Sequence, residues 1–322
     1  MTGVPKVELH VHLEGTAPPD LIRRLAERNG LPLPDGLLAA PDRFAYSDFL
    51  HFLKTYDKAA SVIRTGEDYR DITYEYLMGC AAEGAIYVEL TASPDHAKLV
   101  GLSDEEHLDG IARGIDDARA DSGIEGRILI SCVRNFGVEP ALRIARYAAE
   151  RPHPYVVGFS MAGDEENYPP AAYVEAFEIA SGAGLGCSVH AGEWAGPESV
   201  REALELPVSR IGHGVRSIED PALVEELAER GTVLEVCPTS NVVLGIYPTY
   251  EEHPLPRLIE AGVRATLGSD DPPYFGASIG GEYEICAERL GFDDDDLREI
   301  TKTAIEAAFC DQTLKNRLIR LT

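Results

Sequence analysis

The chain has 322 residues, of which 44% are apolar, and it carries 55 acidic against 29 basic side chains, for a formal net charge of −26. This length suffices for one large hydrophobic core or for two ordinary domains. The negative charge would repel phosphate backbones and anionic headgroups, so we expect neither nucleic acid nor membrane as a partner. A small neutral or cationic substrate fits the charge better.

The cysteines and the first residues predict a cytoplasmic protein. Six cysteines form no CxxC pair, and most of them fall in apolar stretches, a usage typical of reduced, buried thiols. The opening MTGVPKVE shows no charged region followed by an apolar one, as a signal peptide would. No uninterrupted run of 18 apolar residues is present, so we expect no membrane span. The oligomeric state is left open.

The predicted elements alternate between strand and helix along the chain. A first strand at 7–13 and a helix at 18–30 precede an insertion, rich in proline and then in aromatic residues, that carries a helix from about Ser47. Further strands are expected at 85–93, 127–135, 155–163, 186–193, 210–214, 232–240 and 264–273. Helices are expected near 67–83, 103–121, 139–151, 170–181, 197–206, 220–230 and 254–261, and the tail at 281–322 is helical.

Eight strands, each followed by a helix, favour a single parallel (β/α)8 barrel of the TIM type over residues 1–322. The strands are short and apolar without clean alternation, as expected when both faces are covered. The insertion after the first strand would form a helical lid, and the extra C-terminal helices would follow the barrel. An open doubly wound sheet should show a phosphate-binding loop after its first strand, and none is present. The four-Asp run at 293–296 is interpreted as a solvated helix N-terminus.

The stretch VELHVHLEGT raises the question of chemistry. Side chains alternate along a strand, so His10, His12 and Glu14 should share one face. In a barrel of this kind the active site lies at the carboxyl ends of the strands. The polar residues at the other predicted strand ends are Gly163 by its backbone, His190, Glu193, His213, Asp270 and Asp271. Four other histidines, at 51, 96, 107 and 153, fall in predicted helices or loops.

A structural role is the ordinary alternative for each of these residues alone. A single histidine at a strand end is more often a hydrogen-bonded structural residue, and Asp270–Asp271 could cap the helix that follows. Two imidazoles side by side in a core would scarcely both find partners. One metal ion accepts both lone pairs, so a shared metal explains the convergence of all these groups better than separate structural roles do.

His10, His12, His190 and Asp270 would provide three nitrogens and one oxygen, a set that suits zinc with an open position for water, or iron, cobalt or manganese. Glu193 could act as a proton shuttle, and His213 could hold or deprotonate the water. No G-x-S-x-G serine or activated cysteine is present for a covalent mechanism. The residues therefore predict a metal-assisted hydrolase of a small, non-phosphorylated molecule.

The same segments resemble the adenosine deaminase family of the amidohydrolase superfamily. The motifs are PKVELHVHLEGT, MAGDE, SVHAGE, RIGHG, EVCPTSN and GSDDPPYF, in the family order from residue 5 to 275, and weaker similarity covers the rest of the chain. HxH alone is common, whereas SVHAGE with RIGHG and SDDP is specific. Because the strand VVGFSMAG lacks the lysine that bridges two metals in dinuclear relatives, the resemblance implies one zinc.

The resemblance also implies a role for each site residue. His10, His12, His190 and Asp270 would bind the zinc, and Glu193 would protonate purine N1 while zinc hydroxide attacks C6. His213 with Asp270 would orient the hydroxide and take its proton. The substrate would contact His12, Gly163 N–H at N3 and Asp271 at N7, and the residue at the position of Glu14 contacts the ribose side. Phe49 and Phe52 of the insertion resemble apolar lid residues, although ordinary packing explains them equally well.

Two motifs bear on the substrate and point in different directions. The chain has HLEG where enzymes acting on adenosine commonly have HLDG, so Glu14 resembles the adenine deaminases. MAGDE after the fourth strand instead resembles the nucleoside enzymes. From these we expect deamination of adenosine or deoxyadenosine to inosine or deoxyinosine and ammonia. The alternatives are deamination of adenine or another N6-aminopurine derivative and, outside the enzymes, a non-catalytic purine-binding protein.

Overall fold

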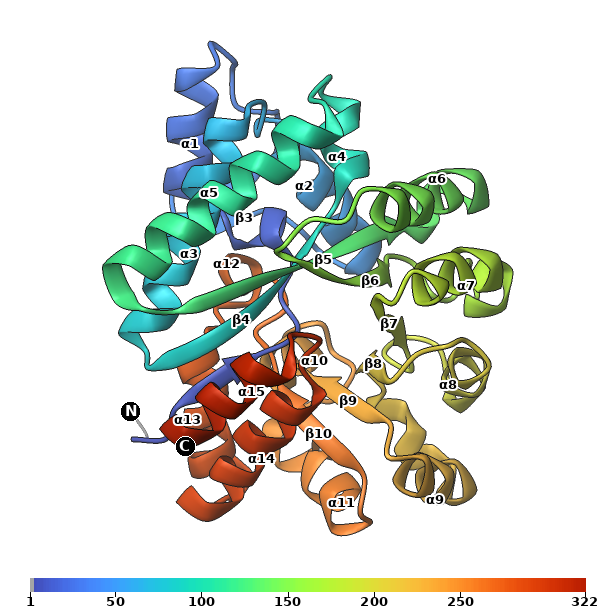
Figure 1. Ribbon diagram of the computed structural model, residues 1–322. Helices are drawn as coiled ribbons and strands as arrows, with labels where there is room; N and C mark the ends of the chain where they lie inside the picture. The colour runs from blue at the N-terminus through green and yellow to red at the C-terminus, as the bar shows by residue number, and fades with distance from the viewer. Residues whose placement is uncertain (1–2) are drawn as a thin grey trace.

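The computed structural model describes residues 3–322, and its centre is a sheet of eight parallel strands in the order β1-β4-β5-β6-β7-β8-β9-β10. Helices surround this sheet on the outside (Figure 1). The strands are β1 Lys6–Glu8, β4 Ala85–Ala92, β5 Glu125–Val133, β6 Val156–Ala162, β7 Gly186–Ala191, β8 Arg210–His213, β9 Val233–Val236 and β10 Arg264–Leu267. Neighbouring strands in the sheet are also neighbours in the chain, as the predicted βα repeat requires.

The sheet closes where the chain leaves its first and last strands. Beyond β1 the backbone stays extended, and Val11 pairs with Asp270. His12 N–H donates to Asp270 O at 3.0 Å, and Asp270 N–H donates to His10 O at 3.2 Å. These bonds join the two edges and confirm the predicted (β/α)8 barrel. They also bring two candidate site segments, 260 residues apart in the chain, into direct contact.

The helices bury one apolar face each against the barrel. Those between the strands are α3 Gly66–Ala82, α4 Pro94–Leu99, α5 Asp104–Ser122, α6 Val138–Glu150, α7 Val174–Gly182, α8 Pro197–Leu204, α9 Pro221–Arg230, α10 Pro238–Val243 and α11 Leu255–Glu260. Capping boxes at Thr65 and Ser103 define the starts of α3 and α5. Short 3-10 turns are η1 Leu13–Thr16, η2 Arg134–Phe136, η3 Pro170–Tyr173, η4 Val215–Glu219, η5 Tyr250–Glu252 and η6 Ile319–Leu321.

The insertion between β1 and β4 holds α1 Pro19–Arg28, a small hairpin of β2 Leu38–Ala40 and β3 Arg43–Phe44, and α2 Phe49–Ala60. The helix expected from about Ser47 is α2, which begins where the Asp48 side chain accepts the His51 N–H. The hairpin was not predicted. Its proline-rich approach gives no alternating apolar pattern from which a strand could be recognised. Whether the insertion opens and closes as a lid stays a prediction.

The tail forms α12 Pro272–Phe275, α13 Ile279–Arg289, α14 Asp294–Ala307 and α15 Gln312–Leu318. Side chains of α14 and α15 pack in a separate apolar cluster with Val7 of β1, with Leu9 just after it and with Tyr87 of β4, and Figure 1 shows these helices beside β1. The Asp293 side chain accepts the Asp295 and Asp296 N–H groups in a capping box. The acidic run is therefore a helix N-terminus, as expected.

Several strands end earlier than predicted. β7 stops at Ala191 and β10 at Leu267, where the expected strands ran to 193 and 273. The residues that follow turn toward the barrel mouth and leave the sheet ladder, so their polar side chains stand at the cavity and not between strands.

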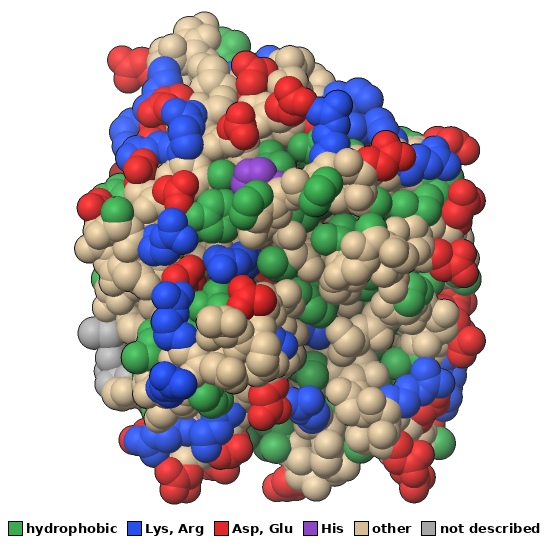
Figure 2. All heavy atoms as spheres, viewed as in Figure 1, with side chains coloured by type: hydrophobic (Ala, Val, Ile, Leu, Met, Phe, Trp, Pro, Cys, Tyr) green, Lys and Arg blue, Asp and Glu red, His purple; other side chains and the backbone are tan. Residues whose placement is uncertain are grey.

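The surface and the thiols fit the composition. All six cysteines are free and buried. Figure 2 shows Lys and Arg interspersed with Asp and Glu on the face it presents. Among the residues that the structure describes, none of the helices combines the length and the apolar character needed to cross a bilayer. The predicted single domain over residues 1–322 includes Met1 and Thr2, which lie outside the described residues.

Candidate active site

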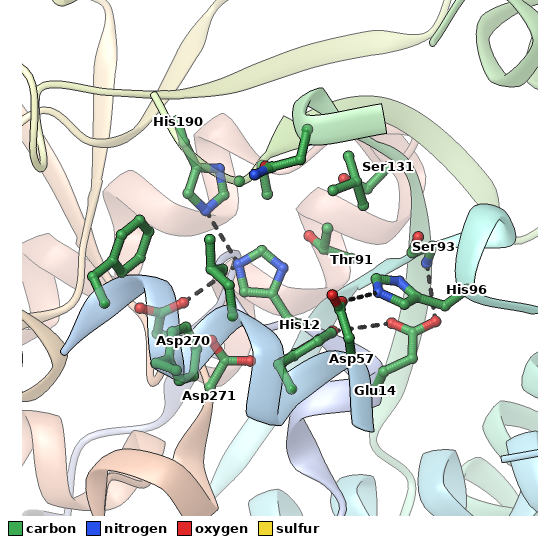
Figure 3. A pocket seen from close by; sticks show the side chains of 18 of the residues that line it. His12, Glu14, Asp57, Thr91, Ser93, His96, Ser131, His190, Asp270 and Asp271 are labelled. Carbon is green, nitrogen blue, oxygen red and sulfur yellow. Dashed lines mark hydrogen bonds and ion pairs between the residues drawn. The ribbon is translucent and has the colours of Figure 1, made fainter. Parts of the chain in front are cut away.

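A cavity of about 840 Å3, open to solvent, lies at the carboxyl ends of the barrel strands. Eight of the predicted site residues line it: His12, Glu14, Gly163, His190, Glu193, His213, Asp270 and Asp271. Figure 3 shows His12, His190 and the two aspartates toward one end of the cavity. Glu14, Asp57, Ser93 and His96 lie toward the other end. We call these the inner end and the distal end.

Three imidazoles and one carboxylate converge at the inner end. The Nε2 atoms of His12 and His190 are 3.1 Å apart. Asp270 Oδ1 lies 3.3 Å from His12 Nε2 and 3.6 Å from His10 Nε2. Ligand atoms at tetrahedral corners about 2.0–2.1 Å from a zinc ion are separated by roughly 3.3 Å. The separations in the structure are therefore compatible with ligands that share a metal ion.

The partners of the outer ring nitrogens turn two of these histidines into lone-pair donors. His10 Nδ1 lies 3.1 Å from the Glu235 carboxylate, and His190 Nδ1 lies 3.0 Å from the Met161 carbonyl oxygen. Both partners only accept, so each Nδ1 carries the proton and each Nε2 directs its lone pair inward. Within residues 3–322, His10 Nε2 is buried without a hydrogen-bond partner, as expected of an atom that faces a cation.

The carboxylates around His10 raise its pKa and so favour a positive charge at this position. Burial lowers its pKa, but the nearby carboxylates of Asp270 and Glu235 outweigh burial and raise the pKa to about 10. A proton is then held at Nε2 where a metal ion would compete for the same lone pair. Glu235 is itself fixed by Arg210, whose Nε lies 2.6 Å from its carboxylate.

Two overlapping groups could hold a cation. Ligand atoms of His10, His190, His213 and Asp270 all lie within 4.8 Å of one another, and so do those of His12, Asp270 and Asp271. The set expected from the sequence includes His12 in place of His213. The choice between them depends on which ring nitrogen of His213 carries its proton.

Asp270 has a strained backbone conformation, and hydrogen bonds from neighbouring segments hold it and the residue before it. Its φ of 62° lies in the left-handed region, which non-glycine residues rarely adopt. Ser240 Oγ–H donates to Asp270 Oδ2 at 2.6 Å. On the preceding residue, Ser269 N–H and Oγ–H both donate to the buried Glu8 carboxylate. Backbone strain that the surroundings enforce in this way is typical of functional sites.

Glu193 is positioned by a second buried carboxylate, Glu165. The Glu165 side chain accepts the N–H groups of Gly192 at 2.9 Å, Glu193 at 2.8 Å and Ala195 at 2.7 Å, and also that of Trp194. Ser199 Oγ–H adds a further bond at 3.0 Å. Glu165 therefore holds the whole turn that carries Glu193. Burial and the charges of Asp270 and Glu165 raise the pKa of Glu193 well above its usual value, which favours the protonated, donating form.

Asp271 and Gly163 form the walls beside this centre. Burial and the charge of Asp270 raise the pKa of Asp271 well above its usual value, so its carboxyl can donate a hydrogen bond. A Cβ on Gly15 would lie 1.7 Å from Asp271 Oδ1, so only glycine fits after Glu14. Gly163 has a φ of +112° and a Cβ there would lie 2.3 Å from Asn135 Oδ1. Both glycines allow the backbone to approach the cavity closely.

Glu14 does not share the face of the two histidines. It lies in η1, where the period of two no longer applies, and its carboxylate turns to the distal end. Ser93 N–H donates to it at 3.1 Å, and the hydroxyls of Tyr69 and Tyr56 lie at 3.3 and 3.4 Å. His107 Nε2 is 3.7 Å away. Ser93, Tyr69 and His107 lie on the Oε1 side of the carboxylate, and Tyr56 contacts Oε2.

The distal end is completed by residues to which the sequence assigned no role. His96 of α4 pairs with Asp57 of α2 at 2.9 Å across the cavity wall. Phe49 and Phe52 of α2 line the same cavity, as the resemblance implied. His96 and His107 were set aside because they fall in predicted helices or loops. His96 follows the end of β4 by four residues, a position that could have identified it, whereas His107 lies within α5 and its place in the sequence gives no such signal.

The supporting residues of the inner end, in contrast, lie inside quoted motifs. Glu165 is the last residue of MAGDE, and EVCPTSN contains Glu235, Ser240 and Asn241. All four are buried. A polar side chain in a buried strand or turn must find a partner, which is the signal that could have identified them.

The fold and the inner end define the class of protein: a (β/α)8 hydrolase with a candidate metal centre at the barrel mouth. The adenosine deaminase family model matches residues 5–321. The chain belongs to that family, as the sequence motifs indicated, and is an aminohydrolase of the kind that releases the amino group of a purine by hydrolysis.

The similar proteins narrow the kind of aminohydrolase. A protein of Chelativorans sp. (strain BNC1) named adenine deaminase is 49% identical over 314 residues, 97% of this chain and 96% of the relative. One of Agrobacterium fabrum with the same name is 47% identical over 319 residues, 98% and 96% of the two chains. The crystal structure of adenine deaminase from Arthrobacter aurescens superposes with a TM-score of 0.90 at 29% identity, covering 99% of this chain and 98% of that one.

An amidohydrolase from Burkholderia ambifaria with bound zinc superposes with a TM-score of 0.88 at 28% identity, over 98% of this chain and 88% of that one.

The expectation of adenosine or deoxyadenosine as the main substrate is wrong. The relatives at 46–49% identity carry the name adenine deaminase, and so does the Arthrobacter structure. MAGDE therefore does not distinguish the nucleoside enzymes, whose substrate it was taken to indicate. The last acid of MAGDE has a structural use in this chain: Glu165 holds the Glu193 turn. The HLEG motif, which pointed to adenine, was the better guide.

Proposed function

We propose that this protein is a metal-dependent adenine deaminase, which converts adenine and water to hypoxanthine and ammonia. The choice of substrate rests on the distal end of the cavity, where the Glu14 carboxylate accepts hydrogen bonds from Tyr56, Tyr69 and Ser93. A ribose hydroxyl that bonded Glu14 would compete with these partners for the carboxylate oxygens, and displacing one of them costs about 1–3 kcal/mol. The names of the full-length relatives support the same substrate.

We assign the metal to His10, His12, His190 and Asp270, with one zinc ion per chain. Support comes from the donor separations, from the inward lone pairs of His10 and His190, and from the zinc-bound Burkholderia relative. Such an ion, when bound, lowers the pKa of a water molecule so that a nucleophile is available near neutral pH. An alternative ligand set has His213 in place of His12. The hydrogen bonds of His213 decide between the two sets.

Glu193 is the proton donor to purine N1 in this proposal. It is 6% exposed, its Oε1 is buried without a hydrogen-bond partner within the described chain, and its raised pKa keeps a proton available. Protonation at N1 draws electron density from C6, where the water oxygen adds. Loss of the C6–N6 bond then releases ammonia. His12, Asp271 and the Gly163 N–H contact the purine, with Asp271 donating to N7 and Gly163 to N3.

The test is a side-by-side kcat/KM panel on zinc-replete protein with adenine, adenosine, deoxyadenosine, N6-methyladenine and N6-methyl-AMP. We expect adenine to be the best substrate by at least about tenfold, with ammonia released stoichiometrically. Dialysis against a chelator should abolish turnover, and zinc should restore it. Preference for a nucleoside or a nucleotide would overturn the substrate. Absence of deamination with every aminopurine would revive the purine-binding alternative. The cytoplasmic location and the absence of nucleic-acid partners stay predictions from the sequence.

A further inference from the structure

A chain of hydrogen bonds with a fixed direction ends on His213. Its first donor is the backbone N–H of Leu255, which donates to His253 Nδ1 at 3.2 Å. His253 Nε2 lies 3.1 Å from Asn241 Oδ1, and Asn241 Nδ2 lies 3.2 Å from His213 Nδ1. His253, Asn241 and His213 are at most 3% exposed, so water does not compete for these bonds.

Only one arrangement of protons satisfies the chain. A backbone N–H can only donate, so His253 Nδ1 is unprotonated and His253 carries its proton on Nε2. That proton requires the oxygen of the Asn241 amide, which leaves the NH2 group facing His213. The amide cannot be turned round, because His253 would then need to accept at both ring nitrogens. His213 Nδ1 must therefore accept, and its proton lies on Nε2.

We propose that Asn241 and His253 are positioning residues that set His213 as a hydrogen-bond donor to the reacting oxygen, and so exclude it as a metal ligand and as a base. The inference rests on the proposed function of the site and decides between its two possible ligand sets. It also corrects the expected role of His213, which was to take a proton from the water.

The surroundings of the three inward histidines agree with this division. His10 and His190 face acceptors with their Nδ1 atoms, Glu235 and the Met161 carbonyl, so their Nε2 lone pairs are free. His213 faces the donor Asn241 instead. The polarity of the outer partner thus separates a ligand from a donor. The backbone of His213 is held at a φ of 60°, in the left-handed region, which aims the ring at the cavity.

The Nε2 atom of His213 lies near two carboxyl groups but is hydrogen-bonded to neither. His213 Nε2 lies 3.7 Å from Glu193 Oε2 and 3.9 Å from Asp270 Oδ2, too far for direct hydrogen bonds. An oxygen between these groups accepts from His213 and can contact both carboxyl groups. With His213 unable to accept, the Asp270 carboxylate is the remaining acceptor for the proton of the attacking water.

Nitrogen-15 NMR of protein labelled at histidine tests the proton positions without reference to turnover. We expect His213 to show a protonated Nε2 and an unprotonated Nδ1, with His10 and His190 showing protonated Nδ1 in the zinc-loaded protein. His213→Gln assigns the signals by their loss. A wild-type His213 protonated at Nδ1 would overturn the proposal, and this holds even if no aminopurine is deaminated, so the two proposals fail separately.

Asn241→Asp reverses the polarity at nearly constant shape. Its carboxylate accepts from both histidines, so the His213 proton should move to Nδ1, and kcat should fall by about 10²–10³-fold with KM and zinc content little changed. Asn316→Asp on the exposed face of α15 is the matched control. His253→Gln retains a donor to Asn241 and should keep both the tautomer and most of kcat, which also covers the case in which Asn241→Asp fails to fold. An unchanged tautomer in Asn241→Asp, or a reversed one in His253→Gln, contradicts the proposal.

Discussion

The inner and distal ends of the cavity are built on different parts of the molecule. Inner-end residues stand at the ends of barrel strands, and charged groups such as Glu235 and Glu165 fix them from behind. At the distal end Glu14 lies on a 3-10 turn, Asp57 on the inserted α2 and His96 on α4, outside the barrel sheet. In the proposed function, the barrel therefore positions the reacting groups, and the segments outside its sheet select the substrate.

The largest effect is expected at the inner end, for Glu193→Gln. The amide cannot supply a proton to N1, so turnover should fall by about 10²–10⁴-fold while the protein keeps its metal. Steady-state kinetics on adenine and metal analysis of the same sample measure both. Glu198→Gln, an exposed acid on the following helix, is the control. A rate close to that of the wild type would remove Glu193 from the mechanism.

Glu165→Gln tests whether the inner end depends on its support. The new NH2 group faces backbone N–H donors, so unfolding free energy should drop by about 1–3 kcal/mol, and kcat should fall about tenfold because the Glu193 turn loosens. Thermal unfolding and kinetics well below Tm separate the two effects. The neighbouring exposed Glu166→Gln should change neither. Lower Tm with unchanged kcat would make Glu165 a structural residue only.

Glu14→Asp tests the distal end. The shorter side chain cannot reach Tyr56, Tyr69 and Ser93 together, so we expect kcat/KM for adenine to fall about tenfold, the equivalent of one lost hydrogen bond. The ratio of adenosine to adenine activity should rise, because the carboxylate is freed toward the cavity. Glu27→Asp on the exposed face of α1 serves as the control. If the ratio stays constant, Glu14 has no part in excluding the sugar.

The smallest effect concerns the Asp57–His96 pair and stability against pH. Burial lowers the pKa of His96, but the hydrogen bond to Asp57 and the charge of Glu14 outweigh it, and the pKa is raised. A raised folded-state pKa stabilises the fold fully below the ordinary value of about 6.5. That stability is lost as pH rises through the folded-state pKa. Asp57 is 55% exposed, so the contribution is below about 1 kcal/mol.

His96→Gln removes that contribution. The Tm difference between wild type and variant should be largest at the acid end of the stable range and shrink as pH rises. Thermal scans at several pH values measure it. His51→Gln, at a half-buried histidine on α2, is the control. A difference that grows with pH would reverse the assigned sign.

The sequence predicted the inner end of the cavity better than the distal end. His10, His12, His190 and Asp270 were identified from their place at strand ends, because parallel strands bring all their carboxyl ends to one side of a barrel. Glu14 was first placed on the wrong face, because the regular strand ends at Glu8 and a 3-10 turn follows. The predicted substrate was wrong for a related reason. The residues that surround Glu14 lie at positions 56, 69, 93 and 107, and no local sequence pattern links them.

The sequence by itself determined the barrel and which polar side chains gather at its mouth, because both depend on periodicity and on the order of elements along the chain. Only the tertiary structure decided what each group is bonded to. The proton of His213 is placed by Leu255, His253 and Asn241, and the Glu193 turn is held by Glu165. A hydrogen bond has a direction and a length that depend on three-dimensional neighbours, and residue types and their spacing do not contain that information.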